Sequence, residues 1–463
     1  MKIKPPVEKN KEYIIDINDI GSDGQGIGKF EGFAVFVPET VVGEKIKAKI
    51  LKVNKSLAYG KVAEILRPSP NRIEPVCSAA GKCGGCSLQH IDYKAQLEFK
   101  TKRVRDTLER IGGFKEINVL PTVGMDNPYN YRNKAQFPVS EGKDGVKIGF
   151  YSKRSHNVIN CEKCYIQHNI NDVIIKIVRD FINKYNISVY DEKSHKGIIR
   201  HILTRVGFTT GEIMVCLVIN GVEVPQIDKL VKKLIAVEGM KSIVLNINRE
   251  KTNVILGKNT KTVWGQSYIT DYIGGVKFNI SPLSFFQVNP VQTKAIYEKA
   301  VQLAGLTGNE NVLDIYCGIG TISLFMAKHA KKVVGIEIIP EAIADAKNNA
   351  KMNGIENAEF LVGSAEDITP ELHRVGFKPD VLVVDPPRKG CDKEVLNTIV
   401  EMAPQKVVYI SCEPSTFARD LKFLVQNGYA LGDVQPFDQF CHSTHVETVT
   451  LMTYCGDNTK NED

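Results

Sequence analysis

The 463-residue sequence contains no hydrophobic run of the ~18 residues that a membrane-spanning helix needs. Its N-terminal segment Met1–Tyr13 has neither the apolar centre nor the small-residue cleavage site of a secretory signal. We find no internal repeat and no low-complexity tract. These absences predict a cytoplasmic protein without a membrane partner, so the 11 cysteines are expected to be thiols, metal ligands or catalytic groups rather than disulfides.

Charge of one sign is in only slight excess. There are 60 Lys and Arg residues against 53 Asp and Glu residues, a formal net charge of +7. That excess is compatible with a polyanionic partner but does not require one. Because the chain is too long for one ordinary hydrophobic core, two or three domains are expected.

Short strand-like runs separated by turn residues fill residues 11–66. Lys45–Ile50 alternates strictly, with apolar residues on one face and lysines on the other. The glycine-rich stretch 21–28 lacks the Gly-Lys-Ser/Thr ending of a phosphate-binding loop, and no helix pattern follows, which favours a hairpin turn. The sequence predicts a small OB-like five-stranded barrel, a fold that often binds nucleic acid.

The middle of the chain mixes strand-like and helix-like segments. From about residue 95 to 111, apolar residues at helical spacing among many Lys and Arg predict a basic amphipathic helix. Its simplest interpretation is a solvated charged face. We predict three domains, namely a β-barrel over 1–68, a central α+β domain over 69–280 and a third domain over 281–463.

After about residue 285 strand-like and helix-like segments alternate. The apolar, mostly β-branched runs are Val312–Ile315, Val333–Glu337, Ala358–Val362, Val381–Asp385 and Val407–Ser411. Such runs are typical of buried parallel strands. The third domain is therefore predicted to be α/β, with a doubly wound, Rossmann-like sheet.

Two motifs predict a ligand site at the carboxyl ends of these strands. Asp314–Gly320 carries two glycines before a helical run, and Glu337 ends the next strand, where a carboxylate can accept hydrogen bonds from ribose hydroxyls. Ser323 replaces the third glycine of a dinucleotide motif, so NAD binding is the rival and purely structural glycines the simplest alternative. Asp385–Arg388 ends the fourth strand with two prolines that restrict the carboxylate, which favours methyl transfer over hydride transfer.

A cysteine and a glutamate predict the chemistry. Cys412 follows the fifth strand and precedes a helical run, where a helix N-terminus would favour the thiolate. A free cysteine is usually a small buried hydrophobic residue, but this one faces the predicted crevice. Glu447 begins a late strand and alone would be an exposed charge. Together they fit a thiolate that adds to carbon 6 of uracil and a base that removes the proton from carbon 5.

Five motifs taken in order resemble the TrmA/RumA family of RNA uracil-5-methyltransferases over nearly the whole chain. They are Ser281–Asn289, Asp314–Gly318, Asp385–Arg388, Ser411–Cys412 and His445–Glu447. The resemblance implies methyl transfer from S-adenosylmethionine to carbon 5 of a uridine, with Cys412 as nucleophile and Glu447 as base. One departure is Glu413, which adds a negative charge where the family usually has Asn.

The resemblance also implies ligand contacts and a substrate. The residues matching the family's S-adenosylmethionine-binding positions are Gln287, Tyr316, Glu337 and Asp385, with Gln287 and Asp385 close to the target base. The barrel resembles a TRAM domain, which contacts RNA. A barrel combined with a cysteine cluster points within the family to 23S ribosomal RNA, with transfer RNA as the less favoured substrate and a monomer as the expected state.

Clustered cysteines predict a metal site. Cys77, Cys83 and Cys86 have the spacing C-x5-C-x2-C on a glycine-rich loop, and Cys161 and Cys164 follow downstream. Spacing alone leaves zinc and iron–sulfur open. The resemblance implies a [4Fe-4S] cluster held by Cys77, Cys83, Cys86 and Cys164, with Cys161 as competitor for the fourth place. Its expected role is structural or RNA-contacting.

Two other functions compete with the methyltransferase. A non-catalytic RNA-binding factor could keep the scaffold, although the intact catalytic pair argues against it. A nicotinamide-dependent oxidoreductase is motivated only by the Gly-x-Gly loop and Glu337.

Overall fold

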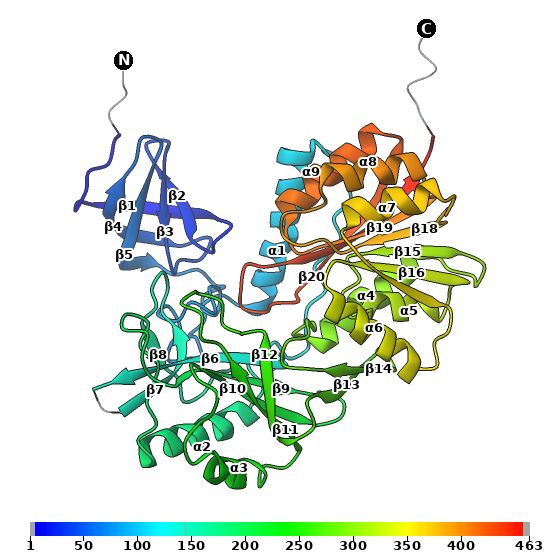
Figure 1. The fold of residues 1–463 in the computed structure, drawn as a ribbon. Helices are drawn as coiled ribbons and strands as arrows, with labels where there is room; N and C mark the ends of the chain where they lie inside the picture. The colour runs from blue at the N-terminus through cyan, green and yellow to red at the C-terminus, as the bar shows by residue number, and fades with distance from the viewer. Residues whose placement is uncertain (1–4, 144, 457–463) are drawn as a thin grey trace.

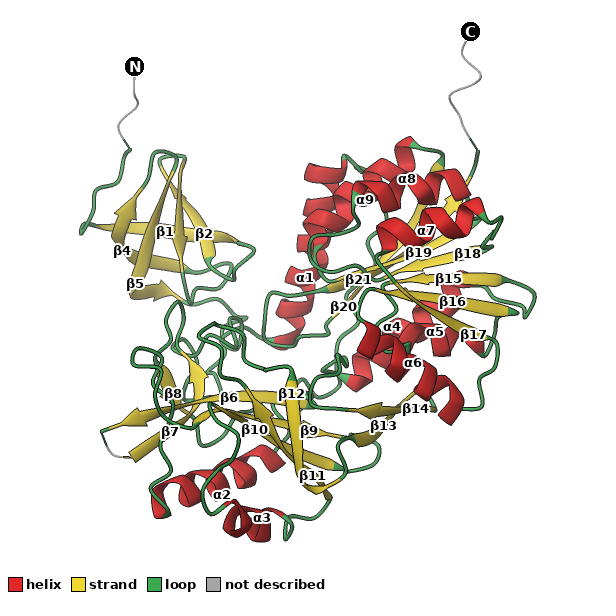
Figure 2. Cartoon of the chain, in the orientation of Figure 1, coloured by secondary structure: helices red, strands yellow, loops and turns green. Residues whose placement is uncertain are grey.

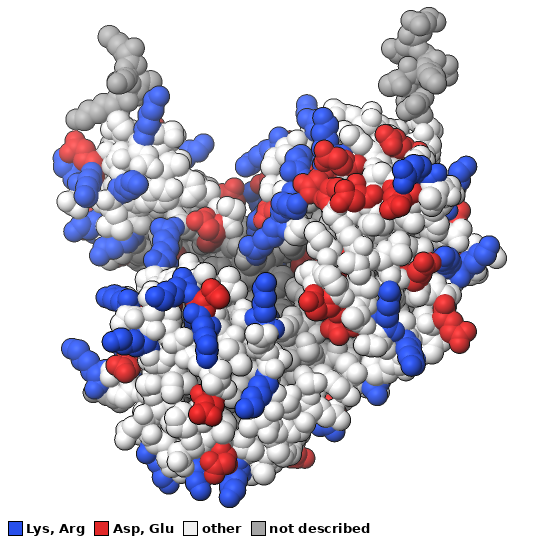
Figure 3. Space-filling view, in the orientation of Figure 1, with Lys and Arg blue, Asp and Glu red and all other residues white. Residues whose placement is uncertain are grey.

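A computed structural model describes residues 5–143 and 145–456, so the first four residues of the polar N-terminal segment lie outside it. The chain forms a barrel, a central body and a C-terminal body (Figure 1), and the space-filling view shows a hollow between them (Figure 3). Figure 3 shows Lys and Arg side chains along the barrel and near this hollow. Within the described residues, none of the helices has the length and apolar character to span a bilayer.

The N-terminal body is a closed barrel with the strand order β1-β2-β3-β5-β4. Its strands are β1 (Glu12–Ile20), β2 (Gly26–Phe30), β3 (Phe33–Val37), β4 (Lys45–Val53) and β5 (Leu57–Arg67). Along β4, Ile46, Ala48 and Ile50 are buried while the lysines between them are partly exposed. β1 and β2 pair antiparallel. The predicted barrel, alternation and hairpin are confirmed.

The basic helix connects the barrel to the rest of the chain. It is α1 (Tyr93–Thr107), which continues into one π-helical turn, η1 (Leu108–Gly112). It packs against α9 (Pro414–Gln426) and β20 (Tyr429–Phe437) of the C-terminal body. Lys100 on this helix is completely buried. The interpretation as a solvated charged face is therefore wrong for the side that meets the C-terminal body.

The central body contains a seven-stranded sheet of order β12-β11-β10-β9-β6-β7-β8. The strands are β6 (Lys134–Gly142), β7 (Gly145–Tyr151), β8 (Val158–Asn160), β9 (Ile199–Val206), β10 (Ile213–Ile219), β11 (Met240–Ile247) and β12 (Asn259–Gly265). Helices α2 (Ile170–Lys184) and α3 (Ile227–Leu234) pack on one face (Figure 2). A hairpin, β13 (Ile269–Ile273) and β14 (Val276–Ile280), leads to the C-terminal body.

The C-terminal body is a seven-stranded sheet of order β17-β16-β15-β18-β19-β21-β20, in which the first five strands run parallel. The remaining strands are β15 (Asn311–Ile315), β16 (Lys332–Glu337), β17 (Ala358–Val362), β18 (Val381–Val384), β19 (Lys406–Ser411) and β21 (Glu447–Tyr454). All five predicted parallel strands are confirmed.

Helices cover both faces of the C-terminal sheet. One core cluster joins the sheet to α4 (Pro290–Ala304), α5 (Thr321–Ala327) and α6 (Pro340–Met352). The other joins it to α7 (Ala365–Arg374), α8 (Lys393–Met402) and α9. The doubly wound α/β fold is confirmed, while the predicted borders at residues 68 and 280 stay predictions.

Candidate functional site

Three strand ends meet at one edge of the C-terminal sheet. Asp385 follows β18, Cys412 follows β19 and Glu447 begins β21. The antiparallel register of β19 and β21 pairs Ser411 with Thr448, so Cys412 and Glu447 occupy the next opposed positions. Because β18 and β19 are parallel neighbours, Asp385 leaves the sheet at this edge too. The sheet brings the three predicted residues together.

Burial and negative charge keep the Cys412 side chain a thiol. The thiol is partly buried, and its pKa is raised to about 12, first by burial and then by Glu447 and Asp385. Arg388 opposes this rise. The expectation that the N-terminus of α9 would favour the thiolate is therefore wrong for the ligand-free protein, because desolvation and two carboxylates outweigh the helix.

Burial disfavours the ionised form of both carboxyl groups, and Asp385 further disfavours that of Glu447. Glu447 is only 6% exposed. Burial, and then the neighbouring Asp385, holds the pKa of Glu447 well above its usual range. Burial raises the pKa of Asp385 to about 6. Two carboxyl groups that are close together and shielded from water cannot both ionise easily, because the resulting charges repel each other. This edge of the sheet therefore retains a proton that two solvated carboxyl groups would lose.

The glycine loop after β15 binds the predicted acidic residue. Gly318 and Gly320 have φ angles of 57° and 81°, which few other residues adopt. The Glu337 carboxylate accepts hydrogen bonds from the backbone N–H of Gly318 at 3.2 Å and of Ile339 at 3.0 Å. Each oxygen keeps a further lone pair, which suits it to accept ribose hydroxyls.

Two buried polar atoms near this loop have no hydrogen-bond partner among the described residues. They are the Tyr316 hydroxyl and one oxygen of Asp314, whose other oxygen accepts a hydrogen bond from Ser323. Burial raises the pKa of Asp314 to about 7. Since buried polar groups are normally satisfied, these atoms indicate a place where a polar ligand completes the structure.

The loop 281–289 is held against the sheet edge by the central body. Arg205 on β9 donates hydrogen bonds to the carbonyls of Pro282 and Ser284, and Asn133 donates to the Gln287 carbonyl at 2.9 Å. Phe285 between them is 71% exposed. An exposed aromatic side chain on a fixed loop can stack on a nucleic-acid base.

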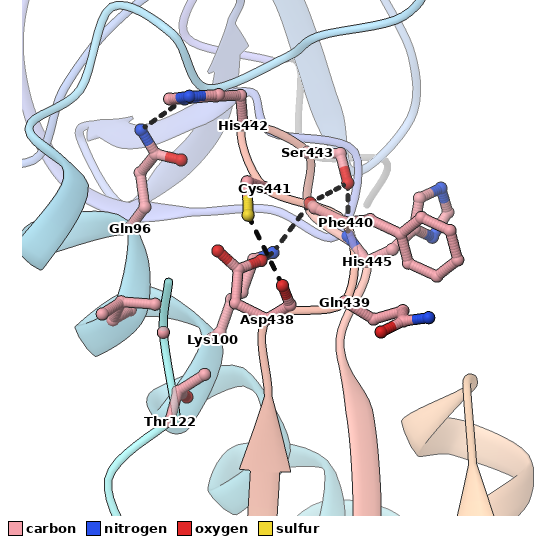
Figure 4. Close-up of polar contacts among 12 residues, drawn as sticks. Gln96, Lys100, Thr122, Asp438, Gln439, Phe440, Cys441, His442, Ser443 and His445 are labelled. Atoms are coloured by element: carbon pink, nitrogen blue, oxygen red, sulfur yellow. Dashed lines mark hydrogen bonds and ion pairs between the residues drawn. The ribbon is translucent and has the colours of Figure 1, made fainter. Parts of the chain in front are cut away.

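The loop that leads into Glu447 is anchored by α1, which the sequence did not reveal. Lys100 forms a fully buried ion pair with Asp438 and donates to the Phe440 carbonyl at 3.1 Å (Figure 4). Tyr93 donates to Asp438 at 2.6 Å, and Arg103 donates to the Thr444 carbonyl. The only sequence signal was an apolar helix face interrupted by a lysine.

Glu413, the departure from the family pattern, has a structural role. Its carboxylate accepts hydrogen bonds from the backbone N–H of Ser415 at 3.4 Å and from its hydroxyl at 2.8 Å, which caps α9. Arg103 lies 3.8 Å away as its charge partner. The added charge is thus taken up by the helix end.

The five predicted cysteines line one cavity of about 370 Å³, together with Arg132, Arg388, Phe440 and His445. Cys161 and Cys164 share a side-chain hydrogen bond, and the backbone N–H groups of Ile166 and Gln167 help lower the pKa of Cys164 to about 7. Within the described ranges, no group of three or more Cys, His, Asp or Glu side chains could hold a single metal ion.

Comparisons with known families match most of the chain. The sequence model of the tRNA (uracil-5-)-methyltransferase family matches residues 92–454, and that of the TRAM domain matches residues 6–63. An uncharacterized RNA methyltransferase of Clostridium tetani is 51% identical over 99% of this chain and 100% of its own length. A second, from Halalkalibacterium halodurans, is 49% identical over 97% of this chain and 99% of its own.

One solved structure is similar over nearly the whole length. It is the tRNA (uracil-54, C5)-methyltransferase of Pyrococcus abyssi in complex with S-adenosyl-L-homocysteine. The two chains are 30% identical with a TM-score of 0.76, covering 95% of this chain and 99% of the other. Because the match covers 95% of this chain, the likeness extends beyond the C-terminal sheet to all three bodies.

Proposed function

The chain belongs to the tRNA (uracil-5-)-methyltransferase family and is an RNA methyltransferase, and from this premise we propose that it methylates carbon 5 of a uridine through a covalent adduct with Cys412. The observation that carries the proposal is the meeting of Cys412, Glu447 and Asp385 at one sheet edge. Neither an oxidoreductase nor a simple RNA-binding factor needs a nucleophile and a buried acid pair there.

The chain's own residues supply the two difficult steps. Cys412 passes its thiol proton to solvent water, and its sulfur forms a bond to carbon 6, which moves the electron pair of the ring double bond into an enolate and makes carbon 5 nucleophilic. After carbon 5 has been methylated, Glu447 takes the carbon 5 proton. The electron pair of the broken carbon 5–hydrogen bond restores the double bond between carbons 5 and 6. The carbon–sulfur bond breaks in the same step, and the sulfur keeps its electron pair as a thiolate. A raised pKa makes Glu447, once ionised, a stronger base than an exposed glutamate.

The residues around the glycine loop fit S-adenosylmethionine, which supplies an activated methyl group when bound. Glu337 would accept the ribose hydroxyls, and Tyr316, Asp385 and Gln287 would complete the site. The two orphaned buried polar atoms support a polar ligand here. The family and fold support the same donor.

We keep 23S ribosomal RNA as the proposed substrate and transfer RNA as the second candidate. The barrel with its lysine-bearing β4 and the cysteine loop motivate the first. The second is favoured by the Pyrococcus abyssi neighbour, which acts on uracil 54 of transfer RNA. A cytoplasmic, monomeric state remains part of the proposal.

The cysteine cavity is proposed to hold a [4Fe-4S] cluster through Cys77, Cys83, Cys86 and Cys164. A tetrahedral zinc with bonds of about 2.3 Å draws its sulfurs to within roughly 4 Å of one another, whereas a four-iron cube holds them farther apart. The support for the proposal is that the thiols of these four cysteines line one cavity, since iron–sulfur clusters are held by Cys thiolates. Iron and acid-labile sulfide in equal amounts would support the cluster, and stoichiometric zinc instead would refute it.

Release of tritium tests the reaction. RNA labelled with tritium at uracil carbon 5 is incubated with the protein and S-adenosylmethionine, using ribosomal and transfer RNA from a strain that lacks the gene. We expect release from one class of RNA, in step with new 5-methyluridine. No release from either class would refute the proposed function, and release from transfer RNA alone would refute the ribosomal assignment.

A further inference from the structure

Gln439 is a completely buried side chain to which the proposed chemistry gives no role. It lies in the loop between β20 and β21, eight positions before Glu447. Its amide nitrogen donates to Gln287 Oε1 at 3.2 Å and to Thr293 Oγ1 at 3.0 Å. Gln439 therefore joins the loop of the proposed base to the residue expected beside the target uracil.

The hydrogen-bond partners fix the direction of each group in this chain. Thr293 on α4 donates its hydroxyl proton to the Asn289 carbonyl at 2.7 Å, and a carbonyl can only accept. Thr293 Oγ1 must then accept from Gln439, whose NH₂ group is turned toward it. The second hydrogen of that NH₂ group goes to Gln287 Oε1.

The polarity of Gln287 follows from this chain. With its oxygen bonded to Gln439, its own NH₂ group points the other way. Gln287 is partly exposed, and no protein acceptor for this NH₂ group is found within the described residues. A rigidly oriented donor without a protein partner is available to a ligand.

We propose that Gln439 is a positioning residue that holds Gln287 with its NH₂ group toward the catalytic site, where it donates to oxygen 4 of the target uracil. Cytosine carries an amino group at that position, so two donors would face each other and cytosine would be rejected. A site built around one hydrogen bond discriminates strongly against a base that cannot form it. The inference rests on the proposed function and deepens it by naming what selects uracil.

Base selection is measured with trapped adducts. RNAs carrying 5-fluorouridine or 5-fluorocytidine at the target position form adducts that cannot eliminate, and the ratio of the two rates gives the discrimination. We expect Gln439→Leu to lower the 5-fluorouridine rate about tenfold, the effect of one lost hydrogen bond, and to reduce the discrimination. Gln439→Glu, which can only accept, should turn Gln287 around and reduce the discrimination further.

Gln292→Leu is the matched control. Gln292 lies on α4, is 1% exposed and donates to the Gly124 carbonyl at 2.7 Å without touching Gln287. Gln292→Leu should lower the unfolding midpoint about as much as Gln439→Leu does. The ratio of the 5-fluorouridine rate to the 5-fluorocytidine rate should stay at the wild-type value. Equal effects of Gln439→Leu and Gln292→Leu on the discrimination, or none from Gln439→Leu, would overturn the proposal.

A second measurement does not depend on turnover. Protein labelled with ¹⁵N at glutamine side chains shows the NH₂ signals of Gln287, assigned by their loss in Gln287→Leu. We expect two NH₂ proton signals whose shifts differ from those of a solvated glutamine in the wild type and in Gln292→Leu, and which move toward the solvated values in Gln439→Leu. Unchanged Gln287 signals in Gln439→Leu would refute the positioning role. If the wild type does not methylate RNA, the proposed function is refuted. The Gln287 signals still show whether Gln439 orients the Gln287 side chain.

Discussion

Two buried groups of ionisable side chains lie at opposite ends of the loop between β20 and β21. They differ in whether a buried charge of opposite sign lies beside each carboxyl group. At one end the Asp438 carboxylate pairs with the Lys100 ammonium and accepts a hydrogen bond from the Tyr93 hydroxyl, so both charges have a partner. Figure 4 shows the pair of Lys100 and Asp438. At the other end Glu447 meets Asp385 and the Cys412 thiol, and only the exposed Arg388 offsets them. The first group fixes the loop, and the second raises the pKa of both Glu447 and Cys412.

The largest loss of activity is expected when Cys412, the proposed nucleophile, is replaced. Cys412→Ala should lower kcat by at least about 10⁴-fold, because the variant lacks the sulfur that is proposed to form the adduct. Tritium release from labelled RNA measures the loss. Cys391→Ala, which changes a cysteine buried in the core cluster with α8 and α9, is the control and should remain active. A turnover in Cys412→Ala near that of the wild type would refute the covalent route.

Replacing the base separates the two steps. Glu447→Gln should lower kcat by about 10²–10⁴-fold while adduct formation continues, because only the removal of the carbon 5 proton is blocked. A covalent protein–RNA band should accumulate on denaturing gels. If the variant turns over slowly without any such band, Glu447 acts before the adduct forms and its assignment as the base is wrong.

The buried ion pair of Lys100 and Asp438 is tested by removing one of its two charges. Lys100→Met should cost about 3–5 kcal/mol of unfolding free energy, because Asp438 stays buried without its cation. The double variant Lys100→Met with Asp438→Leu should recover most of that loss. Urea unfolding measures both. A double variant as unstable as the single one would show that packing, and not charge, holds the loop.

The acid pair predicts a smaller effect with a defined pH window. The folded-state pKa of Asp385 is raised from 3.8 to about 6, so the folded protein binds this proton more tightly than the unfolded chain. Its stabilising contribution is full below pH 4 and is lost as the pH rises through 6, roughly 3 kcal/mol in all.

Asp385→Asn does not titrate, so its stability relative to the wild type should rise between pH 4 and pH 7 and then level off. Urea unfolding at pH 4.5 and 7.5 measures this change. The exposed carboxylate of Asp228 on α3 provides the control variant Asp228→Asn, which removes a carboxylate far from the acid pair in the sequence. A constant difference for Asp385→Asn would contradict the raised pKa.

The sequence predicted the ends of strands well and the contacts between distant segments poorly. Asp385, Cys412 and Glu447 could be found because a parallel sheet places every strand end at one edge. Lys100 and Asp438 lie 338 positions apart, and helical periodicity shows that a face is buried but not which residue it meets. The direction of the Cys412 pKa shift escaped the sequence for the same reason, since it comes first from burial and then from carboxylates on two other strands.

The place of β21 has a consequence for the synthesis of the protein. This strand follows every other strand of its sheet in the sequence, yet it lies between β19 and β20. While the ribosome is still translating the preceding segments, Glu447, the proposed base, has not been made, and β19 lacks its antiparallel neighbour. A nascent or prematurely terminated chain that ends before β21 therefore lacks a residue that the proposed reaction needs.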